Sequence, residues 1–222
     1  MAALDAQRIS DWLAYGLARF VQSHFAGGTQ EFVHERLLQA NAWETLSMLF
    51  PDNPVEIERP ALNWPAGCKE GLDLVVRQTK AWAMIGEIKY FDSVSDVGEG
   101  RAAVARDIAR LAQADISAST GIRLFICVFH SHGKRELWRD DPAARKGNNW
   151  LGVIARLLPS EVGTENSTTV QEVESEAADW QTKTPGTPLP ATTTLRIKLL
   201  SAVEFVQRTQ TGIVRVWQVT PS

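Results

Sequence analysis

The fold of this chain of 222 residues is decided by the stretch GLDLVVRQTKAWAMIGEIKYF, residues 71–91. It contains two apolar runs, 72–77 and 82–91, whose residues favour β-strands. About four residues, 78–81, join the two runs. A pair of strand-forming runs with so short a connection predicts an antiparallel β-hairpin.

The segments around the hairpin predict one α/β domain over residues 1–222, with a mixed sheet flanked by helices. Residues 159–193, which are rich in Ser, Thr, Glu, Gly and Pro, are expected to form a flexible acidic loop. Thr29 is expected to cap the second helix, and the core is expected over about 28–158. The expected elements are helices at 5–25 and 29–50, a strand at 55–60, the hairpin, a helix at 101–117, a strand at 121–130, a helix at 149–158, and a final hairpin of strands 195–205 and 212–219.

Charge and composition exclude several classes of protein. The formal net charge is −3, yet residues 101–158 carry 10 Lys/Arg against 5 Asp/Glu. Such a basic section attracts a phosphate backbone, or it is simply a solvated helix face. No apolar run reaches the length of a transmembrane helix. The N-terminal stretch carries Asp5 and Asp11 and lacks the basic and apolar regions of a signal peptide, so it is expected to be mature structure. We therefore expect no membrane partner, a cytoplasmic protein, and reduced, buried thiols at Cys68 and Cys127.

The candidate site lies in the first hairpin. Residues i and i+2 of a strand share a face, so Glu87 and Lys89 project together and Ile88 points into the opposite, packed face. A short hairpin can place Asp73 beside Glu87. Two neighbouring carboxylates are costly without a cation, and Mg²⁺ or Mn²⁺ is the usual one. The backbone carbonyl of Ile88 is a further candidate ligand.

These residues resemble the PD-(D/E)XK nuclease superfamily, which is restriction-endonuclease-like. The resemblance rests on Asp73, Glu87 and Lys89 in the setting GLDLVV…AMIGEIKYF, and it covers roughly residues 28–130. It implies a core of α-β-β-β-α-β, here followed by a C-terminal β-hairpin. It implies Asp73, Glu87 and the Ile88 carbonyl as metal ligands. It also implies Lys89 as a catalytic base or an electrostatic stabiliser. The residue before Asp73 is Leu72, where the family pattern has Pro.

Many members of this superfamily add a glutamate from the first core helix. Glu35 falls in line with the apolar stripe of the predicted helix, formed by Leu38, Ala42, Leu46 and Leu49, and would need Lys89 or a metal as partner. Glu31 lies one turn earlier and remains the alternative. We favour Glu35, while both residues could instead decorate the first turns of the helix. His34 is expected to face elsewhere.

Other polar groups carry weaker hypotheses. Asp107, Arg110 and Gln113 lie near one face of the helix after the hairpin, where an Asp107–Arg110 ion pair is the simplest interpretation. His130 and His132 could contact phosphate together with Lys134 and Arg135, or they form a plain polar loop.

The tryptophans divide into two groups. Trp138, between Arg135 and Arg139, is the best candidate for stacking on a base. The tryptophans predicted to lie in the core are Trp12, Trp43, Trp82 and Trp217.

Taken together, these patterns predict a Mg²⁺- or Mn²⁺-dependent nuclease whose partner is nucleic acid, with DNA expected and RNA left open. A homodimer or a larger defence or repair complex is an extrapolation from the resemblance. Two alternatives remain. One is a non-catalytic binding or assembly module of the same fold. The other is an acidic immunity-type inhibitor, supported by the charge of −6 over residues 1–100.

Overall fold

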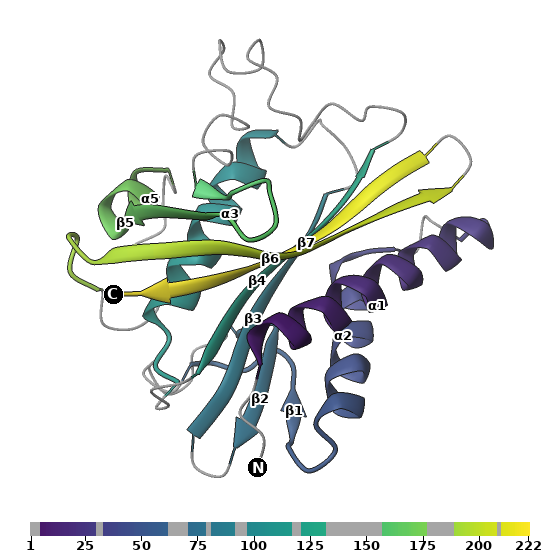
Figure 1. Cartoon of the computed structure of the whole chain (residues 1–222), viewed down its shortest axis with the longest axis horizontal. Helices are drawn as coiled ribbons and strands as arrows, with labels where there is room; N and C mark the ends of the chain where they lie inside the picture. Colours follow the sequence, from purple (N-terminus) through teal and green to yellow (C-terminus); the bar gives the residue numbers. More distant parts are fainter. Residues whose placement is uncertain are drawn as a thin grey trace.

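A computed structural model of the chain describes residues 5–29, 33–61, 71–78, 81–91, 97–116, 121–131, 157–176, 189–207 and 210–222. Seven strands form one sheet in the order β1-β2-β3-β4-β7-β6-β5 (Figure 1). The helices are α1 (Ala6–Ala26), α2 (Glu35–Leu49), α3 (Val97–Gln113) and α5 (Val170–Glu176). The strands are β1 (Val55–Glu56), β2 (Leu74–Gln78), β3 (Ala81–Phe91), β4 (Ile122–Ser131), β5 (Glu165–Thr169), β6 (Thr194–Gln207) and β7 (Gln210–Pro221).

The predicted hairpin is confirmed as β2 and β3, which pair antiparallel with Leu74 opposite Gly86. Strand β4 then returns after α3 and pairs parallel to β3. Every other pairing in the sheet is antiparallel. The chain is therefore an α/β protein with a mixed sheet, as predicted.

Helices cover both faces of this sheet (Figure 1). On one face, α1 and α2 pack on β-strand residues such as Met84, Ile88 and Ile126. On the other face, α3 and α5 pack on Ile85, Phe125 and Trp217. Alternate residues of β3 and β4 thus enter different cores, as the two-residue period of a strand requires.

The C-terminal hairpin is confirmed and extends the sheet. Strand β7 pairs antiparallel with β4, and β6 pairs with β7 along nearly its whole length. Because β7 lies beside β4, the central strands β3 and β4 are protected on both sides by neighbours.

Several predicted boundaries were wrong. Helix α2 begins at Glu35, with His34 as its N-cap, and not at residue 29. The Thr29 hydroxyl instead donates to the carbonyl of His24 at 3.2 Å, at the end of α1. Strand β1 spans only Val55–Glu56, and Arg59 forms an isolated bridge with Leu72.

The predicted loop 159–193 was also wrong in its described part, which contains β5 and α5. The polar composition of this segment favoured a loop, but an edge strand can be polar because one side of it faces solvent. The backbone of β5 pairs antiparallel with β6. The Glu172 carboxylate accepts from the backbone N–H of Thr169 at 2.8 Å, where α5 begins, and Val173 is fully buried. The predicted helix at 149–158 lies outside the described residues except at its end.

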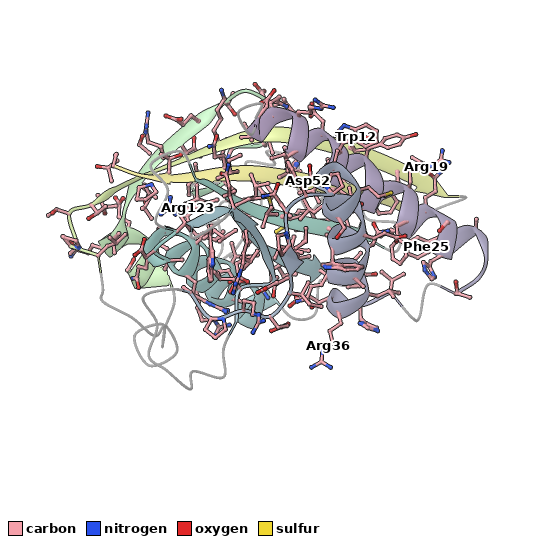
Figure 2. All side chains as sticks on the ribbon, turned by 90° about the horizontal axis from the view of Figure 1, so that it is seen from below. Trp12, Arg19, Phe25, Arg36, Asp52 and Arg123 are labelled. Carbon is pink, nitrogen blue, oxygen red and sulfur yellow. The ribbon has the colours of Figure 1, made fainter. Side chains whose placement is uncertain are left out.

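Two of the four predicted core tryptophans are buried, Trp82 and Trp217. The prediction was wrong for the other two, because Trp12 is 50% and Trp43 is 43% exposed. Figure 2 shows Trp12 on the outer side of α1, together with Arg19. Trp43 uses its indole N–H to donate to the Val55 carbonyl at 2.8 Å. Helical periodicity places Trp12 and Trp43 at the margin of the apolar stripe of their helices. At such a position, burial depends on whether another element packs against the side chain.

Among the described helices, none combines the length and the apolar character needed to cross a bilayer.

Candidate functional site

Strand β3 separates the chemistry of its two faces, as predicted. Ile88 is fully buried among the side chains beneath α1 and α2. Glu87 and Lys89 project from the other face, where both line a pocket with α3. Glu87 is almost fully buried, whereas the Lys89 side chain keeps 18% of its surface exposed.

Asp73 joins this group from the residue just before β2. Its Oδ2 accepts the backbone N–H of Ile88 at 2.6 Å. Its Oδ1 accepts from the side-chain amide of Gln39 on α2 at 2.8 Å. The hairpin register therefore places Asp73 against the Glu87–Lys89 segment, as the sequence predicted. The carboxylate is fixed by one donor on each oxygen.

Lys89 is held between two carboxylates from different helices. Its Nζ lies 3.1 Å from Glu35 Oε1 and 3.1 Å from Asp107 Oδ2. Glu35 therefore has Lys89 as its partner, as expected, while the choice of Glu35 over Glu31 stays a prediction. Glu31 lies outside the described residues. Asp107 is almost completely buried, so this ion pair is shielded from water on the α3 side.

Arg110 continues the network along α3. Its guanidinium lies 3.5 Å from Asp107 Oδ1, which confirms the predicted ion pair, and 3.4 Å from Glu87 Oε1. It also donates to the carbonyl of Gly71. Gln113, predicted on the same face, is buried but is not among the residues that line the pocket.

The pocket enclosed by these groups has a volume of about 270 Å³. Five of its lining residues are acidic and three are basic, so its formal charge is −2 when all of them are ionised. Asp73, Glu87 and Asp107 are buried, whereas Glu35 is partly exposed and Glu58 is exposed. Buried carboxylates that lie so close together are costly without a cation beside them. The complete lining is Glu35, Glu58, Gly71, Asp73, Glu87, Lys89, Arg106, Asp107 and Arg110.

Gln39 and Glu58 were missed from the sequence. Gln39 lies one turn after Glu35, a signal that could have found it, and its amide donates to both Asp73 and Glu58. Glu58 reaches the site through a left-handed backbone with φ of 54°. A Cβ on Gly71 would lie 2.3 Å from the Glu58 backbone, so only glycine permits this approach. No local sequence pattern predicts the left-handed backbone of Glu58 or its close approach to Gly71.

Burial and charge shift the acidity of the site. Burial raises the pKa of Asp73 to about 6, although the Ile88 N–H and the Lys89 charge act against it. Burial, together with the charges of Asp73 and Asp107, raises the pKa of Glu87 well above its usual range. Burial acts to lower the pKa of Lys89, but the nearby Asp107, Glu35, Asp73 and Glu87 outweigh it and raise that pKa. Lys89 is therefore an ammonium throughout the physiological range.

The donor set suits a hard divalent cation in kind. Carboxylate oxygens are the ligands that Mg²⁺ and Mn²⁺ prefer, and the pocket carries a negative surplus. Glu87 Oε1 is buried without a hydrogen bond, and its recorded contact is the ion pair with Arg110. Within the described ranges, no three His, Cys, Asp or Glu side chains are arranged to hold a metal. A cation here would thus compete with Lys89 and Arg110 for their carboxylates.

The remaining candidates do not line this pocket or lie outside the described residues. His34 is exposed as the N-cap of α2. Cys127 is a buried free thiol of β4, paired with Lys89 in the register and packed in the core on the α3 side of the sheet. His130 is described only in its backbone, within β4. The residues whose predicted roles fall outside the described part of the chain are Cys68, His132, Lys134, Arg135 and Trp138.

Comparisons with protein-family profiles, with curated protein sequences and with solved structures each return no match.

Proposed function

We propose that this protein is a metal-dependent nuclease that hydrolyses phosphodiester bonds, with Asp73, Glu87 and Lys89 at its centre. The observation that carries the proposal is the convergence of these three residues on one pocket whose lining has more acidic than basic residues and in which Asp73, Glu87 and Asp107 are buried. A glutamate from the preceding helix, Glu35, contacts the lysine there. Acidic ligands beside a fixed ammonium suit a cation and a phosphate diester together.

The order of the elements supports a restriction-endonuclease-like core for this function. Helix α2 is followed by the antiparallel strands β1, β2 and β3, then by α3 and the parallel strand β4. That order is α-β-β-β-α-β, the arrangement implied by the sequence resemblance. Strands β7, β6 and β5 extend the sheet beyond β4 and contribute no residue to the lining of the pocket, which lies on the α3 side of β3.

The roles of the residues follow from their contacts. Asp73 and Glu87, with the Ile88 carbonyl, would hold Mg²⁺ or Mn²⁺, which when bound supplies a Lewis acid and acidifies water. Lys89 is kept charged by Glu35 and Asp107, so it serves as an electrostatic stabiliser of the phosphate and not as a proton acceptor. Gln39 holds Asp73 in a fixed orientation.

The second candidate function is a non-catalytic binding or assembly module. Its support is the internal pairing of the pocket, in which Lys89 and Arg110 already contact Glu35, Glu87 and Asp107. A pocket that uses its charges only for one another would hold the helices on the sheet without any metal. The two functions differ in one measurable property, the affinity of the pocket for a divalent cation.

The experiment combines cleavage with metal binding. Plasmid, linear duplex, single-stranded DNA and RNA are incubated with the protein in Mg²⁺, Mn²⁺ or EDTA. We expect metal-dependent cleavage that is lost in Asp73→Asn and Lys89→Ala and kept in Glu44→Gln, an exposed glutamate of α2. We also expect Mn²⁺ to stabilise the protein by about 2.7 kcal/mol at a hundredfold excess over its Kd.

Each negative outcome has a definite meaning. A folded protein that neither cleaves nor gains stability with Mn²⁺ would refute the nuclease and favour the binding module. Cleavage that survives in Asp73→Asn would place the activity elsewhere or in a contaminant. Mn²⁺ stabilisation that Asp73→Asn abolishes, without cleavage of these substrates, would retain the metal site and point to a narrower substrate.

A further inference from the structure

Arg106 differs from the other two cations of the pocket. Lys89 is paired with Glu35 and Asp107, and Arg110 is paired with Asp107 and Glu87. The Arg106 side chain lines the same pocket, yet it has no hydrogen bond or ion pair with any other residue in the described ranges. A partly buried guanidinium without a partner, beside a surplus of carboxylates, is a group available to a ligand.

In the part of the chain that the structure describes, Arg106 takes no part in the ion-pair network of the pocket, whereas its neighbour on α3 does. Asp107, the next residue, is directed into the buried network, where it contacts both Lys89 and Arg110. Arg106 lines the pocket and is only partly buried, so part of its side chain is open to solvent. Its guanidinium presents several N–H donors in one plane, a geometry that matches two oxygens of a phosphate.

We propose that Arg106 is the anion-binding residue of this pocket and that its ligand is a phosphate group of nucleic acid or of a nucleotide. This inference rests on the proposed nuclease function and adds to it a residue that touches the substrate. Because the pocket itself is negative, a phosphate is repelled until a divalent cation offsets that charge. Phosphate and metal are therefore expected to bind cooperatively, with Arg106 contributing to the phosphate only.

The test measures the two ligands separately by calorimetric titration. Thymidine 5′-monophosphate is titrated into the protein with and without Mn²⁺, and Mn²⁺ is titrated alone. We expect Arg106→Gln to weaken nucleotide binding by about tenfold or more, since a charge-assisted hydrogen bond is lost. Arg106→Lys should recover part of the affinity, because it restores the charge without the planar donors. Mn²⁺ affinity should be unchanged or slightly higher in Arg106→Gln, since a nearby positive charge is removed.

Arg19→Gln is the matched control, because Arg19 is an exposed arginine of α1, on the other face of the sheet (Figure 2). It should bind both ligands as the wild type does. Equal nucleotide affinity in Arg106→Gln and the wild type would overturn the inference. Parallel loss of nucleotide and Mn²⁺ would also overturn it, because that pattern indicates a structural role. No nucleotide binding by the wild type would overturn it as well.

Failure of this inference can be distinguished from failure of the nuclease proposal. Mn²⁺ binding and cleavage with an unimpaired Arg106→Gln variant would remove Arg106 from the substrate site and leave the nuclease intact. Nucleotide binding that depends on Arg106, in a protein that takes no Mn²⁺ and cuts nothing, would keep the anion site. The same result would refute the proposed nuclease function.

Discussion

On strand β3, Met84 and Ile88 face α1 and α2, whereas Glu87 and Lys89 face α3 and the N-terminal end of α2. The apolar side chains are fully buried among their own kind. Each such burial contributes about 1.5–3 kcal/mol to folding. The charged side chains are also removed from water, which acts against folding unless every charge is matched. Strand β3 thus has one face whose burial stabilises the fold and an opposite face whose buried charges lower the free energy of unfolding unless they are paired.

This difference indicates how the fold supports its site. Strand β3 is fixed between β2 and β4, and its apolar face is anchored by two helices. The opposite face can then hold a group of charges that would not be stable by itself. Changes on the apolar face should therefore alter stability, and changes on the charged face should alter chemistry more than stability.

The largest expected effect is on the charged face. Glu87→Gln should lower metal-dependent cleavage by about a thousandfold or more, because a proposed ligand of the cation is lost. The same substitution should leave the free energy of unfolding unchanged or raise it, since burial already disfavours the charged form of Glu87. Cleavage rates and urea unfolding curves of the two proteins measure both quantities.

A fall in the stability of Glu87→Gln by several kcal/mol would break the comparison. It would mean that the Glu87–Arg110 pair holds the fold together, as in the binding-module alternative. Glu44→Gln, on the exposed side of α2, controls for a general effect of removing an acidic charge.

The next effect is on the apolar face. Ile126→Ala on β4 should lower the free energy of unfolding by about 2–5 kcal/mol, because Ile126 is fully buried beneath α1 and α2. Cleavage per folded molecule should be retained, because the side chain points away from the pocket. Val206→Ala, at a residue that is 48% exposed, should change stability by less than about 0.5 kcal/mol. Loss of activity in a folded Ile126→Ala protein would show that the two faces are coupled.

The sequence was sufficient where one period or one short connection decides the structure. Alternation along β3 predicted that Glu87 and Lys89 share a face and that Ile88 opposes them. The short connection to β2 predicted that Asp73 is brought near them. Helical spacing placed Glu35 and Asp107 on the correct sides of α2 and α3. These are local consequences of residue type, and the described structure bears them out.

The sequence was insufficient where distant segments decide the structure. Glu58 depends on a left-handed residue, on a bridge between Arg59 and Leu72 and on close packing against Gly71. The polar segment of β5 forms a strand because its backbone pairs with the free edge of β6. Whether Trp12 is buried depends on what else reaches α1. Long-range pairing and packing override local propensity in each case.

A pH dependence should separate the two faces further. The pKa of Asp73 is about 6 in the folded protein, against its ordinary value of 3.8. Between these values the folded state binds more protons than the unfolded state, so stability falls as pH rises from 3.8 to about 6. The expected loss is about 2–3 kcal/mol at higher pH. Asp73→Asn should reduce this dependence, leaving the part that comes from the raised pKa of Glu87, and be more stable than the wild type at pH 8.

Urea unfolding at pH 4 and pH 8, without metal, measures the effect. Ile126→Ala should keep the slope of the wild type, because it changes no titrating group. A wild type whose stability rises over this interval would show that hydrogen bonds from Gln39 and Ile88 outweigh the burial of the Asp73 carboxylate.

The smallest effect is the coupling between Lys89 and Asp107, whose charged atoms lie 3.1 Å apart. Lys89→Met leaves Asp107 buried without its ammonium partner, and Asp107→Asn removes the charge that needs one. The double variant should therefore be more stable than the sum of the single effects predicts, by about 0.5–3 kcal/mol. A sum that is simply additive would mean that Glu35, on the open side, is the partner that holds Lys89. Its replacement by glutamine would then show the coupling instead, and the charged face would be organised from α2 and not from α3.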